Sequence, residues 1–183
     1  MQSLAEIYAR HSTPSGVGDK GTLHSYIPIY ETVLAPIRHT AQRVLEIGVA
    51  EGHSLRMWRE YFPNATVIGV DRQPCPHSLN GCLFLRGDAT SLATYDGLRS
   101  LDVVIDDGSH LLDHQLHSHA ILWPLVRPGG LYVIEDIQQF DTVRSVFEGL
   151  DGDVEIYDFR ATSGVADDVM VVIRRPIPID RPI

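Results

Sequence analysis

The sequence predicts an α/β fold, built on a doubly wound, mostly parallel seven-stranded sheet with helices on both faces. Apolar, β-branched segments recur along the chain and end in polar residues, and segments with a helical apolar pattern alternate with them. Near-continuous apolar strands are typical of a parallel sheet covered on both faces. The alternation implies right-handed β-α-β crossovers. A chain of 183 residues with 44% hydrophobic residues suits one domain with a substantial core.

The first forty residues are expected to hold one helix, from Ser3 to Arg10. The segment that follows it, residues 12–30, is too rich in Gly, Pro and Ser for regular structure. We therefore divide the chain into an N-terminal helix and lid-like segment (1–40), a core (41–175) and a Pro-rich C-terminal tail (176–183). The prolines of the tail favour an extended end.

Seven segments are expected as strands, and the last two of them are expected to pair antiparallel. These strands are residues 43–48, 65–71, 82–88, 101–107, 130–136, 154–159 and 168–175. The residues expected to face the core from two helices are Leu55, Trp58 and Phe62 in a helix over 54–62, and Leu112, Leu116 and Ile121 in a helix over 111–126. The sequence RPGG, residues 127–130, is expected as a turn before the fifth strand.

Charge and cysteine content exclude several functional classes. The formal net charge of -9 argues against nucleic acid as a partner, because nucleic-acid binders usually carry a basic face. No secretory signal pattern and no run of 18 apolar residues occurs, so we expect neither export nor membrane insertion, and hence a cytoplasmic protein. Cys75 and Cys82 have the spacing of neither a zinc site nor a disulfide framework, which predicts reduced thiols.

Glycines and an acid follow the first predicted strand in the sequence VLEIGVAEGHSL. Glu46 closes the strand, and Gly48 and Gly52 flank the turn into a helix, where glycines let a ligand approach the backbone and the helix start offers free N–H groups. The dinucleotide fingerprint G-x-G-x-x-G is absent, and Glu51 would repel a pyrophosphate. NAD is therefore disfavoured, although a plain strand-to-helix turn also explains these glycines.

Acids also close the second and third strands. Asp71 is placed to accept both hydroxyls of a ribose, as in proteins that bind NAD or S-adenosylmethionine (SAM), and Asp88 to accept from an adenine amino group. Each acid alone is also explained as a turn former or helix cap, and for Asp88 singly we favour that explanation. Acids at the ends of three strands together indicate a ligand site, because open α/β sheets bind ligands at the carboxyl ends of their strands.

Five blocks of the chain resemble, in this order, class I SAM-dependent methyltransferases: VLEIGVAEGHSLRMW, VIGVD, GD, VVIDDGSH and VRPGGLYVIEDI. More narrowly, they are similar to the metal-dependent sugar O-methyltransferases of macrolide antibiotic pathways, of the mycinamicin and tylosin type, and to the rhamnosyl O-methyltransferase and cephalosporin hydroxylase family. The similarity runs from about Asp19 to Val172, and IDDGSH and PGGLYVIED are its most specific parts. It implies a Rossmann-like methyltransferase fold and SAM as the cofactor.

Four carboxylates and an imidazole end the fourth and fifth strands: Asp106, Asp107, His110, Glu135 and Asp136. In a sheet of methyltransferase order these strands are neighbours, and crowded carboxylates favour a hard divalent cation such as Mg²⁺. The resemblance implies Asp107, Glu135 and Asp136 as metal ligands, with His110 and Asp107 as the catalytic residues. Asp106 would then lie near the amino-acid end of SAM.

The strand ends and the resemblance together predict one set of cofactor-binding residues: Glu46, Gly48, Gly52, Asp71, Arg72, Gly87, Asp88 and Asp106, with Lys20, His24 and Tyr26 from the segment DKGTLHSYIPIY, which would close over the cofactor. An ordered surface loop explains the last three equally well. The acids after the fourth strand are open to another explanation, as caps of the helix that begins near Leu111. A zinc site built on His110, His114 and His117 is disfavoured, because the HExxH glutamate is missing.

The expected function is O-methylation of a hydroxyl on a sugar or other small natural product. Mg²⁺ lowers the pKa of a coordinated hydroxyl, and a neutral His110 can take its proton. Only about 17 residues separate Asp136 from the strand at Val154, fewer than in the similar enzymes, so the acceptor site would be open or completed by another subunit of a homo-oligomer. Two alternatives stay open at this point, a NAD(P)-dependent oxidoreductase and a noncatalytic SAM-binding module.

Overall fold

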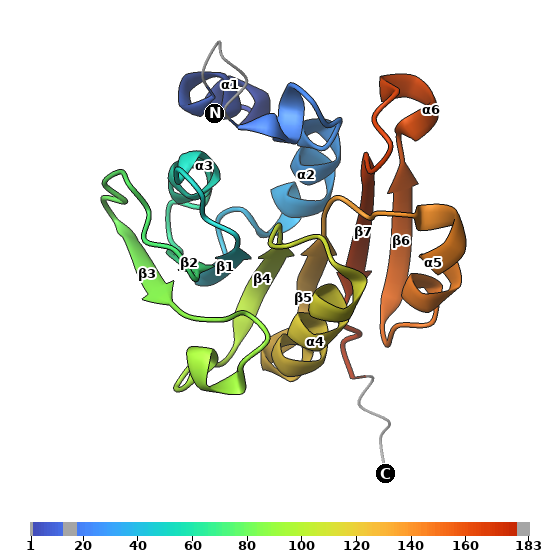
Figure 1. Cartoon of the computed structure of the whole chain (residues 1–183). Helices are drawn as coiled ribbons and strands as arrows, with labels where there is room; N and C mark the ends of the chain where they lie inside the picture. Colours follow the sequence, from blue (N-terminus) through green and yellow to red (C-terminus); the bar gives the residue numbers. More distant parts are fainter. Residues whose placement is uncertain (1, 13–17, 179–183) are drawn as a thin grey trace.

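A computed structural model describes residues 2–12 and 18–178 and confirms the predicted fold class. Its seven strands form one sheet in the order β3-β2-β1-β4-β5-β7-β6 (Figure 1). The strands are β1 Arg43–Ile47, β2 Thr66–Asp71, β3 Cys82–Arg86, β4 Leu101–Asp106, β5 Val126–Ile134, β6 Asp153–Asp158 and β7 Val169–Arg174. The first five run parallel, and β7 lies antiparallel between β5 and β6, so the predicted antiparallel pair is present.

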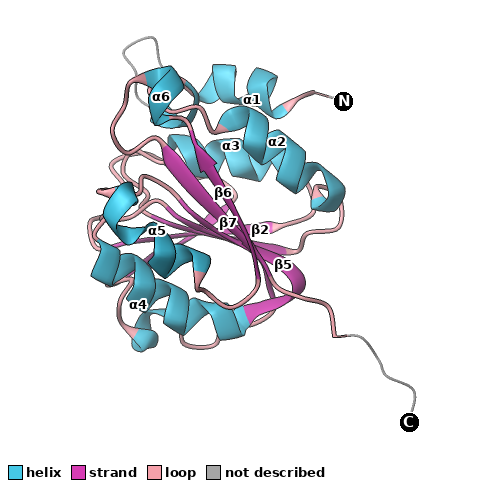
Figure 2. Ribbon diagram, turned by 90° about the vertical axis from the view of Figure 1, so that its right-hand side faces the viewer, coloured by secondary structure: helices cyan, strands magenta, loops and turns pink. Residues whose placement is uncertain are grey.

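Helices cover both faces of this sheet. They are α1 Leu4–His11, α2 Ile27–Leu34, α3 His53–Tyr61, α4 Leu112–Leu122, α5 Phe140–Glu148 and α6 Arg160–Ser163, with short 3-10 turns η1 Asp19–Gly21, η2 Ala35–Ile37, η3 Leu92–Tyr95 and η4 Trp123–Leu125. Figure 2 shows α1, α2 and α3 on one face and α4 and α5 on the other. Two separate apolar clusters fill the two layers between sheet and helices, as a doubly wound fold requires. No helix in the described ranges is long and apolar enough to cross a membrane.

The register of the central strands places the candidate site residues side by side. All six residues of β4 are buried, which explains the unbroken apolar pattern of this segment. Asp106, the last residue of β4, pairs with Ile47 of β1 on one side and with Ile134 of β5 on the other. The residues that follow these strands therefore meet at one edge of the sheet.

The N-terminal segment is more ordered than its composition predicts. Where we expected irregular chain, α2 forms and packs its apolar side on the sheet, burying Tyr30, Val33 and Leu34. Pro28 lies in the first turn of this helix, where a missing N–H breaks no hydrogen bond. The proline content that predicted irregular structure over residues 12–30 is in part explained by this helix start. Residues 13–17 of the segment, and residues 179–183 of the predicted tail, lie outside the described residues.

The chain between α4 and β5 also differs from the prediction. The helix ends at Leu122, and the residues expected as a turn, 127–130, belong to β5, which begins at Val126. A register shift against β4 and a positive φ at Gly129 (76°) allow Pro128 to lie within the strand without a turn. The free Cys75 and Cys82 agree with the prediction of reduced thiols.

The buried side of α4 is polar, which the apolar pattern did not reveal. The residues it buries are Gln115, Ser118, His119 and Leu122, whereas Leu112, Leu116 and Ile121 are only partly buried. His119 is 6% exposed and packs against Trp123 and Tyr132, with ring centroids 5.3 and 4.9 Å away. Its Nε2 has no hydrogen-bond partner, and burial lowers the pKa of His119 from 6.5 to about 4.

Acidification is expected to destabilise the protein through His119. The folded protein keeps the imidazole neutral, whereas the unfolded chain takes up a proton below a pKa of 6.5, so the stability is full above that value and falls as the pH drops toward 4. Between pH 7 and pH 5 the loss from this group is about 2 kcal/mol. Urea unfolding at both pH values should show a loss smaller by that amount in His119→Leu. An identical pH dependence of both proteins would contradict this role.

Candidate active site

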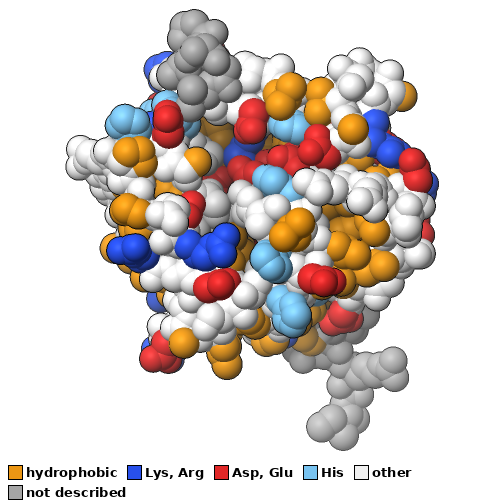
Figure 3. Space-filling view, in the orientation of Figure 1, with side chains coloured by type: hydrophobic (Ala, Val, Ile, Leu, Met, Phe, Trp, Pro, Cys, Tyr) orange, Lys and Arg blue, Asp and Glu red, His pale blue; other side chains and the backbone are white. Residues whose placement is uncertain are grey.

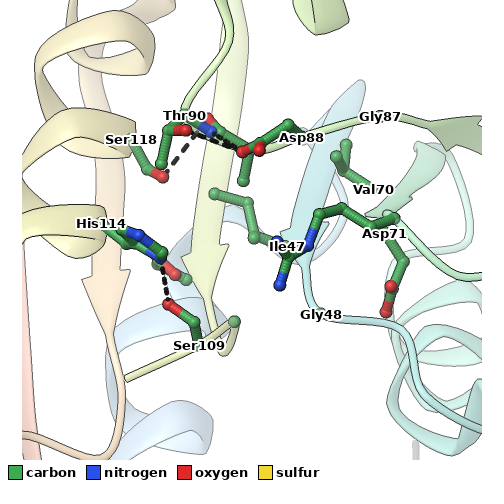
Figure 4. Close-up of a pocket in the computed structure, with 14 residues that line it drawn as sticks. Ile47, Gly48, Val70, Asp71, Gly87, Asp88, Thr90, Ser109, His114 and Ser118 are labelled. Atoms are coloured by element: carbon green, nitrogen blue, oxygen red, sulfur yellow. Dashed lines mark hydrogen bonds between the residues drawn. The ribbon is translucent and has the colours of Figure 1, made fainter. Parts of the chain in front are cut away.

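Two adjoining pockets lie at the carboxyl ends of the strands. The first pocket runs along β1, β2 and β4 and includes Asp71, Asp88 and Asp106, and the second reaches toward Lys20 and His110. Gly48, Asp71 and Gly108 line both pockets, so the two are parts of one cleft. Ligands of open α/β sheets bind at this edge. Figure 4 shows the first pocket, with Asp71 and Gly48 on one side and His114, Ser109 and Ser118 on the other.

Gly48 makes the close approach at the centre of the cleft possible. It has a φ of 85°, and a Cβ atom there would lie 1.8 Å from the backbone oxygen of Asp107. Any larger residue would therefore push apart the loops after β1 and β4. Gly48 therefore lets the backbone after β1 lie directly against the backbone after β4, and the approach of a ligand at this position stays a prediction.

Backbone amides hold the carboxylate of Asp71 in place. Its Oδ2 accepts hydrogen bonds from the N–H groups of Val49 (2.9 Å) and Ala50 (3.3 Å), and its Oδ1 accepts one from Gln73 (2.8 Å). Burial alone would raise the pKa of Asp71, but these donors outweigh it and lower the pKa below its usual range. The cleft therefore presents a fixed, ionised carboxylate at the junction of its two pockets.

The two other acids of the first pocket differ in environment. Asp88 is a turn former, as its local sequence suggested, because its Oδ1 accepts from the N–H (2.9 Å) and hydroxyl (2.7 Å) of Thr90, yet it also lines the pocket. Asp106 is 3% exposed. Burial, with a further contribution from Asp107, raises the pKa of Asp106 to about 7. Arg72 and Gly87 line the same pocket.

Sequence reasoning missed three polar residues of this pocket, Ser109, His114 and Ser118. Ser109 Oγ and His114 Nδ1 are 2.8 Å apart and hydrogen-bonded, so a loop residue and a helix residue form one wall. His114 and Ser118 are four residues apart and share the side of α4 that faces the cleft (Figure 4). That spacing of polar residues, four apart on one helix, was the available signal in the sequence.

A lysine occupies the centre of the predicted metal-binding acids. Lys20 Nζ lies 2.6 Å from Asp107 Oδ2, 2.7 Å from each carboxylate oxygen of Glu135, and 3.5 Å from Glu46 Oε1. Burial lowers the pKa of Lys20, but the three carboxylates outweigh it and raise the pKa well above the usual range. The side chain is therefore an ammonium ion held among acids.

Two tyrosines complete this buried network. Tyr30 donates to Glu135 Oε1, and Tyr26 donates to Asp136 Oδ1 at 2.7 Å. Burial, which the ammonium of Lys20 only partly offsets, raises the pKa of Glu135 well above its usual range, and burial with the charge of Asp107 raises that of Asp136. Burial therefore disfavours the ionised form of both carboxylates, although protein donors bind them. Carboxylates with such shifted pKa values are typical of functional sites.

His110 lies beside this network at the open end of the cleft. Its Nε2 is 3.8 Å from Asp136 Oδ2, and its Nδ1 is buried without a hydrogen-bond partner. Both His110 and Asp136 have positive φ angles (57° and 56°), a strained conformation that occurs at functional sites. Figure 3 shows the red acids and pale-blue histidines gathered around a recessed blue side chain in the upper part of this face.

Ligand atoms of Asp107, His110 and Asp136 lie within 4.8 Å of one another, close enough to hold one metal ion. A second group of this kind combines Asp19 and His24 with the same Asp136. Within residues 2–12 and 18–178, no such group includes His114 or His117. The helix-cap explanation fails, since α4 has Leu111 at its N-cap and no side-chain cap.

Four of the predicted cofactor-binding residues line neither pocket of the cleft: Glu46, Gly52, His24 and Tyr26. Glu46 accepts hydrogen bonds from Ser54 Oγ (2.7 Å) and Trp58 Nε1 (3.0 Å), which fastens α3 to β1. Gly52 is the N-cap of α3, with a φ of 74°. These positions support the cleft from behind.

Comparison with known proteins connects this site to methyltransferases. The chain is 39% identical over 153 residues to 8-demethyl-8-alpha-L-rhamnosyl tetracenomycin-C 2'-O-methyltransferase of Streptomyces olivaceus, a match that covers 75% of the chain and 38% of that enzyme. It is 38% identical over 146 residues to mycinamicin VI 2''-O-methyltransferase of Micromonospora griseorubida, covering 73% and 36%. The chain thus spans less than two fifths of the length of these relatives.

A solved structure agrees with the fold and with these relatives. The MycE methyltransferase from the mycinamycin biosynthetic pathway, in complex with Mg and SAH, superposes with a TM-score of 0.74 and 29% identity, over 96% of this chain and 55% of that one. Residues 31–154, which include β1 to β5 and the acids at their ends, match the FtsJ-like methyltransferases. The chain belongs to the FtsJ-like methyltransferase family.

Proposed function

We propose that this chain is a SAM-dependent O-methyltransferase that methylates a hydroxyl of a sugar or other small natural product with the help of a divalent cation. One observation carries the proposal: the cleft joins a pocket lined by Asp71, Asp88 and Asp106 to a group of acids and a histidine, through Gly48 and Asp71. The relatives are named as O-methyltransferases of rhamnosyl and macrolide compounds, which supports a hydroxyl of this kind as the acceptor.

The residues of the first pocket fit the adenosine part of SAM. The fixed carboxylate of Asp71 is suited to a ribose diol, and Asp88 and Asp106 offer carboxyl groups further along the pocket. Gly48 lines both pockets and lies where they join. SAM supplies an activated methyl group, so the task of the chain is to bind it and to orient the acceptor oxygen.

The acids beside the second pocket fit a divalent cation. Asp107, Glu135 and Asp136 offer oxygen ligands of the kind that Mg²⁺ prefers. The charge of the ion would offset the cost of burying the carboxylates of Glu135 and Asp136. When bound, the cation would lower the pKa of an acceptor hydroxyl. MycE was solved with Mg, which supports this assignment.

His110 is the general base in this proposal. We assign the proton of the acceptor hydroxyl to Nε2, because Nδ1 is buried while Nε2 faces Asp136. The carboxylate of Asp136 at 3.8 Å would stabilise the imidazolium that results. Lys20, on the other side of the acids, keeps Asp107 and Glu135 in place before a ligand binds.

Neither alternative function has comparable support. A NAD(P)-dependent oxidoreductase has no need of the acids after β5, and the family match is to methyltransferases. A noncatalytic SAM-binding module has no need to keep His110 beside Asp107 and Asp136. The net charge of -9 favours a small acceptor over nucleic acid.

Calorimetric titration with SAM, NAD⁺ and Mg²⁺, separately and together, tests the proposal. We expect SAM and Mg²⁺ to bind and NAD⁺ not to bind. Absence of SAM binding would refute the proposed function, whereas SAM binding without a divalent-cation site would leave a metal-independent methyltransferase. Methylation assays with rhamnosylated and macrolide acceptors then identify the acceptor class.

Replacement of Asp71 by Asn is expected to weaken SAM binding about tenfold to a hundredfold, since hydrogen bonds to a charged group contribute about 1.5–3 kcal/mol. The amide keeps the size of the side chain but removes the charge that the backbone amides of Val49 and Ala50 hold in place. Calorimetry measures the affinity, with the exposed Asp96→Asn as the control. An unchanged affinity would contradict the role of Asp71 at the ribose.

A further inference from the structure

Polar side chains of the N-terminal segment reach the same acids that the proposed function assigns to a metal ion. The contacts join Lys20 to Asp107 and Glu135, Tyr30 to Glu135, and Tyr26 to Asp136. The sequence placed this segment over the cofactor. In the structure its polar side chains contact the proposed metal-binding acids, so the segment can also affect the binding of a metal ion.

Lys20 contacts the carboxylate oxygens that a metal ion would bind. Its side chain is 3% exposed, and its Nζ lies within 2.7 Å of one oxygen of Asp107 and both oxygens of Glu135. An ammonium has three N–H donors, and these oxygens satisfy all of them. Among the described residues Asp107, His110 and Asp136 form a group of side chains close enough to hold a metal, and Glu135 does not belong to that group.

We propose that Lys20 is a built-in counter-ion that competes with a divalent cation for Asp107 and Glu135. This inference rests on the proposed function. Two cations a few ångströms apart in a buried site repel strongly, so an ion on these oxygens requires the ammonium to withdraw. In the metal-free protein the lysine offsets part of the repulsion among the acids, and it thereby sets the affinity for the metal.

Withdrawal of Lys20 would act on a small part of the segment. Lys20 belongs to η1, Asp19–Gly21, and the backbone oxygen of Asp19 accepts from Thr22, Leu23 and His24. The following helix α2 is held by apolar side chains in the core, although the N–H of its N-cap residue, Tyr26, donates to the backbone oxygen of Lys20 at 3.0 Å. Metal binding is therefore coupled to the order of residues 19–24 and leaves α2 in place. Because such coupling is reciprocal, loss of the lysine must strengthen metal binding.

Mn²⁺ titration of the wild type and Lys20→Met, followed by calorimetry and by the electron paramagnetic resonance of the free ion, tests the competition. Methionine keeps the length of the side chain and removes its charge. We expect Lys20→Met to bind Mn²⁺ at least about tenfold more tightly than the wild type. Arg43→Met is the matched control, because it removes one positive charge from an exposed side chain at the opposite end of β1, and its affinity should stay within about twofold of the wild type.

Equal or weaker Mn²⁺ binding by Lys20→Met would overturn the inference and leave the proposed metal site standing. Absence of Mn²⁺ binding by both proteins would overturn the inference together with the metal in the proposed function. If Lys20→Met is unfolded without metal, Mn²⁺ should fold it and EDTA should reverse the effect. Failure of Mn²⁺ to fold it would count against competition.

Hydrogen exchange gives a second measurement that does not depend on a variant. Saturating Mg²⁺ should speed amide exchange in residues 19–24 of the wild type while that of α2 stays unchanged. Slower exchange in residues 19–24 with Mg²⁺ would mean that metal and lysine bind together, which contradicts the competition.

Discussion

His110→Ala is expected to lower kcat about a thousandfold while the affinity for SAM stays within about twofold of the wild type. General-base catalysis contributes about 10²–10⁴-fold to a rate, and no other imidazole lies in the same group of ligand atoms. The SAM affinity should hold because His110 lines the second pocket and not the first. Single-turnover rates measured at saturating SAM and acceptor separate these two effects.

His117→Ala is the matched control for this experiment. His117 lies on the exposed side of α4, where its ring contacts the backbone oxygen of Asp113, and it lines neither pocket. Its removal should leave kcat unchanged. Full activity of His110→Ala would refute the assignment of the base, and a large fall in SAM affinity would mean that His110 acts in cofactor binding instead.

The strands could be predicted because burial on both faces leaves an unbroken apolar pattern, whereas the neighbouring positions of the fourth and fifth strands were implied by the resemblance to methyltransferases. β4 is the best example, since all its residues are buried and its end is marked by Asp106 and Asp107. Once β1, β4 and β5 are placed side by side, the meeting of their terminal acids follows from geometry alone. The location of the site was therefore readable from the sequence.

The contacts among the side chains of the site were harder to predict, because they depend on packing between segments that are distant in the sequence. Lys20 and Tyr30 are separated from Glu135 by more than a hundred residues, and no local pattern shows that they will bind it. The polar buried side of α4 is a similar case, in which Ser118 and His114 face the cleft although apolar periodicity pointed elsewhere. Sequence patterns are therefore more reliable for predicting which residues are buried than for predicting which polar groups contact one another.

The backbone conformation of two site residues was also difficult to predict from the sequence. His110 and Asp136 adopt the left-handed conformation, which Asp and His enter more often than most non-glycine residues, but residue type alone does not show which aspartates and histidines of the chain adopt it. The surrounding contacts, Tyr26 with Asp136 and the loop after β4 against Gly48, hold the two residues there. Strain of this kind is a property of the folded site as a whole.

Glu135→Gln is expected to weaken binding of Mg²⁺ at least about tenfold and to lower kcat by a similar factor, and to destabilise the metal-free protein. The amide is a weaker ligand for a hard cation than a carboxylate. The free energy of unfolding without metal should fall by about 3 kcal/mol, because the buried ammonium of Lys20 loses one of its carboxylate partners. Calorimetry with Mg²⁺ and urea unfolding measure the two quantities.

Glu46→Gln makes the same chemical change in the same network and serves as the control. Glu46 also lies beside Lys20 but accepts from Ser54 and Trp58 of α3, away from the proposed ligands, so its replacement should leave Mg²⁺ affinity nearly unchanged. If both variants lost Mg²⁺ equally, the effect would be one of total charge, and Glu135 would have no special place as a ligand. If neither lost Mg²⁺ and activity survived thorough chelation, the acids after β5 would serve the fold and the methyl transfer would proceed without a metal.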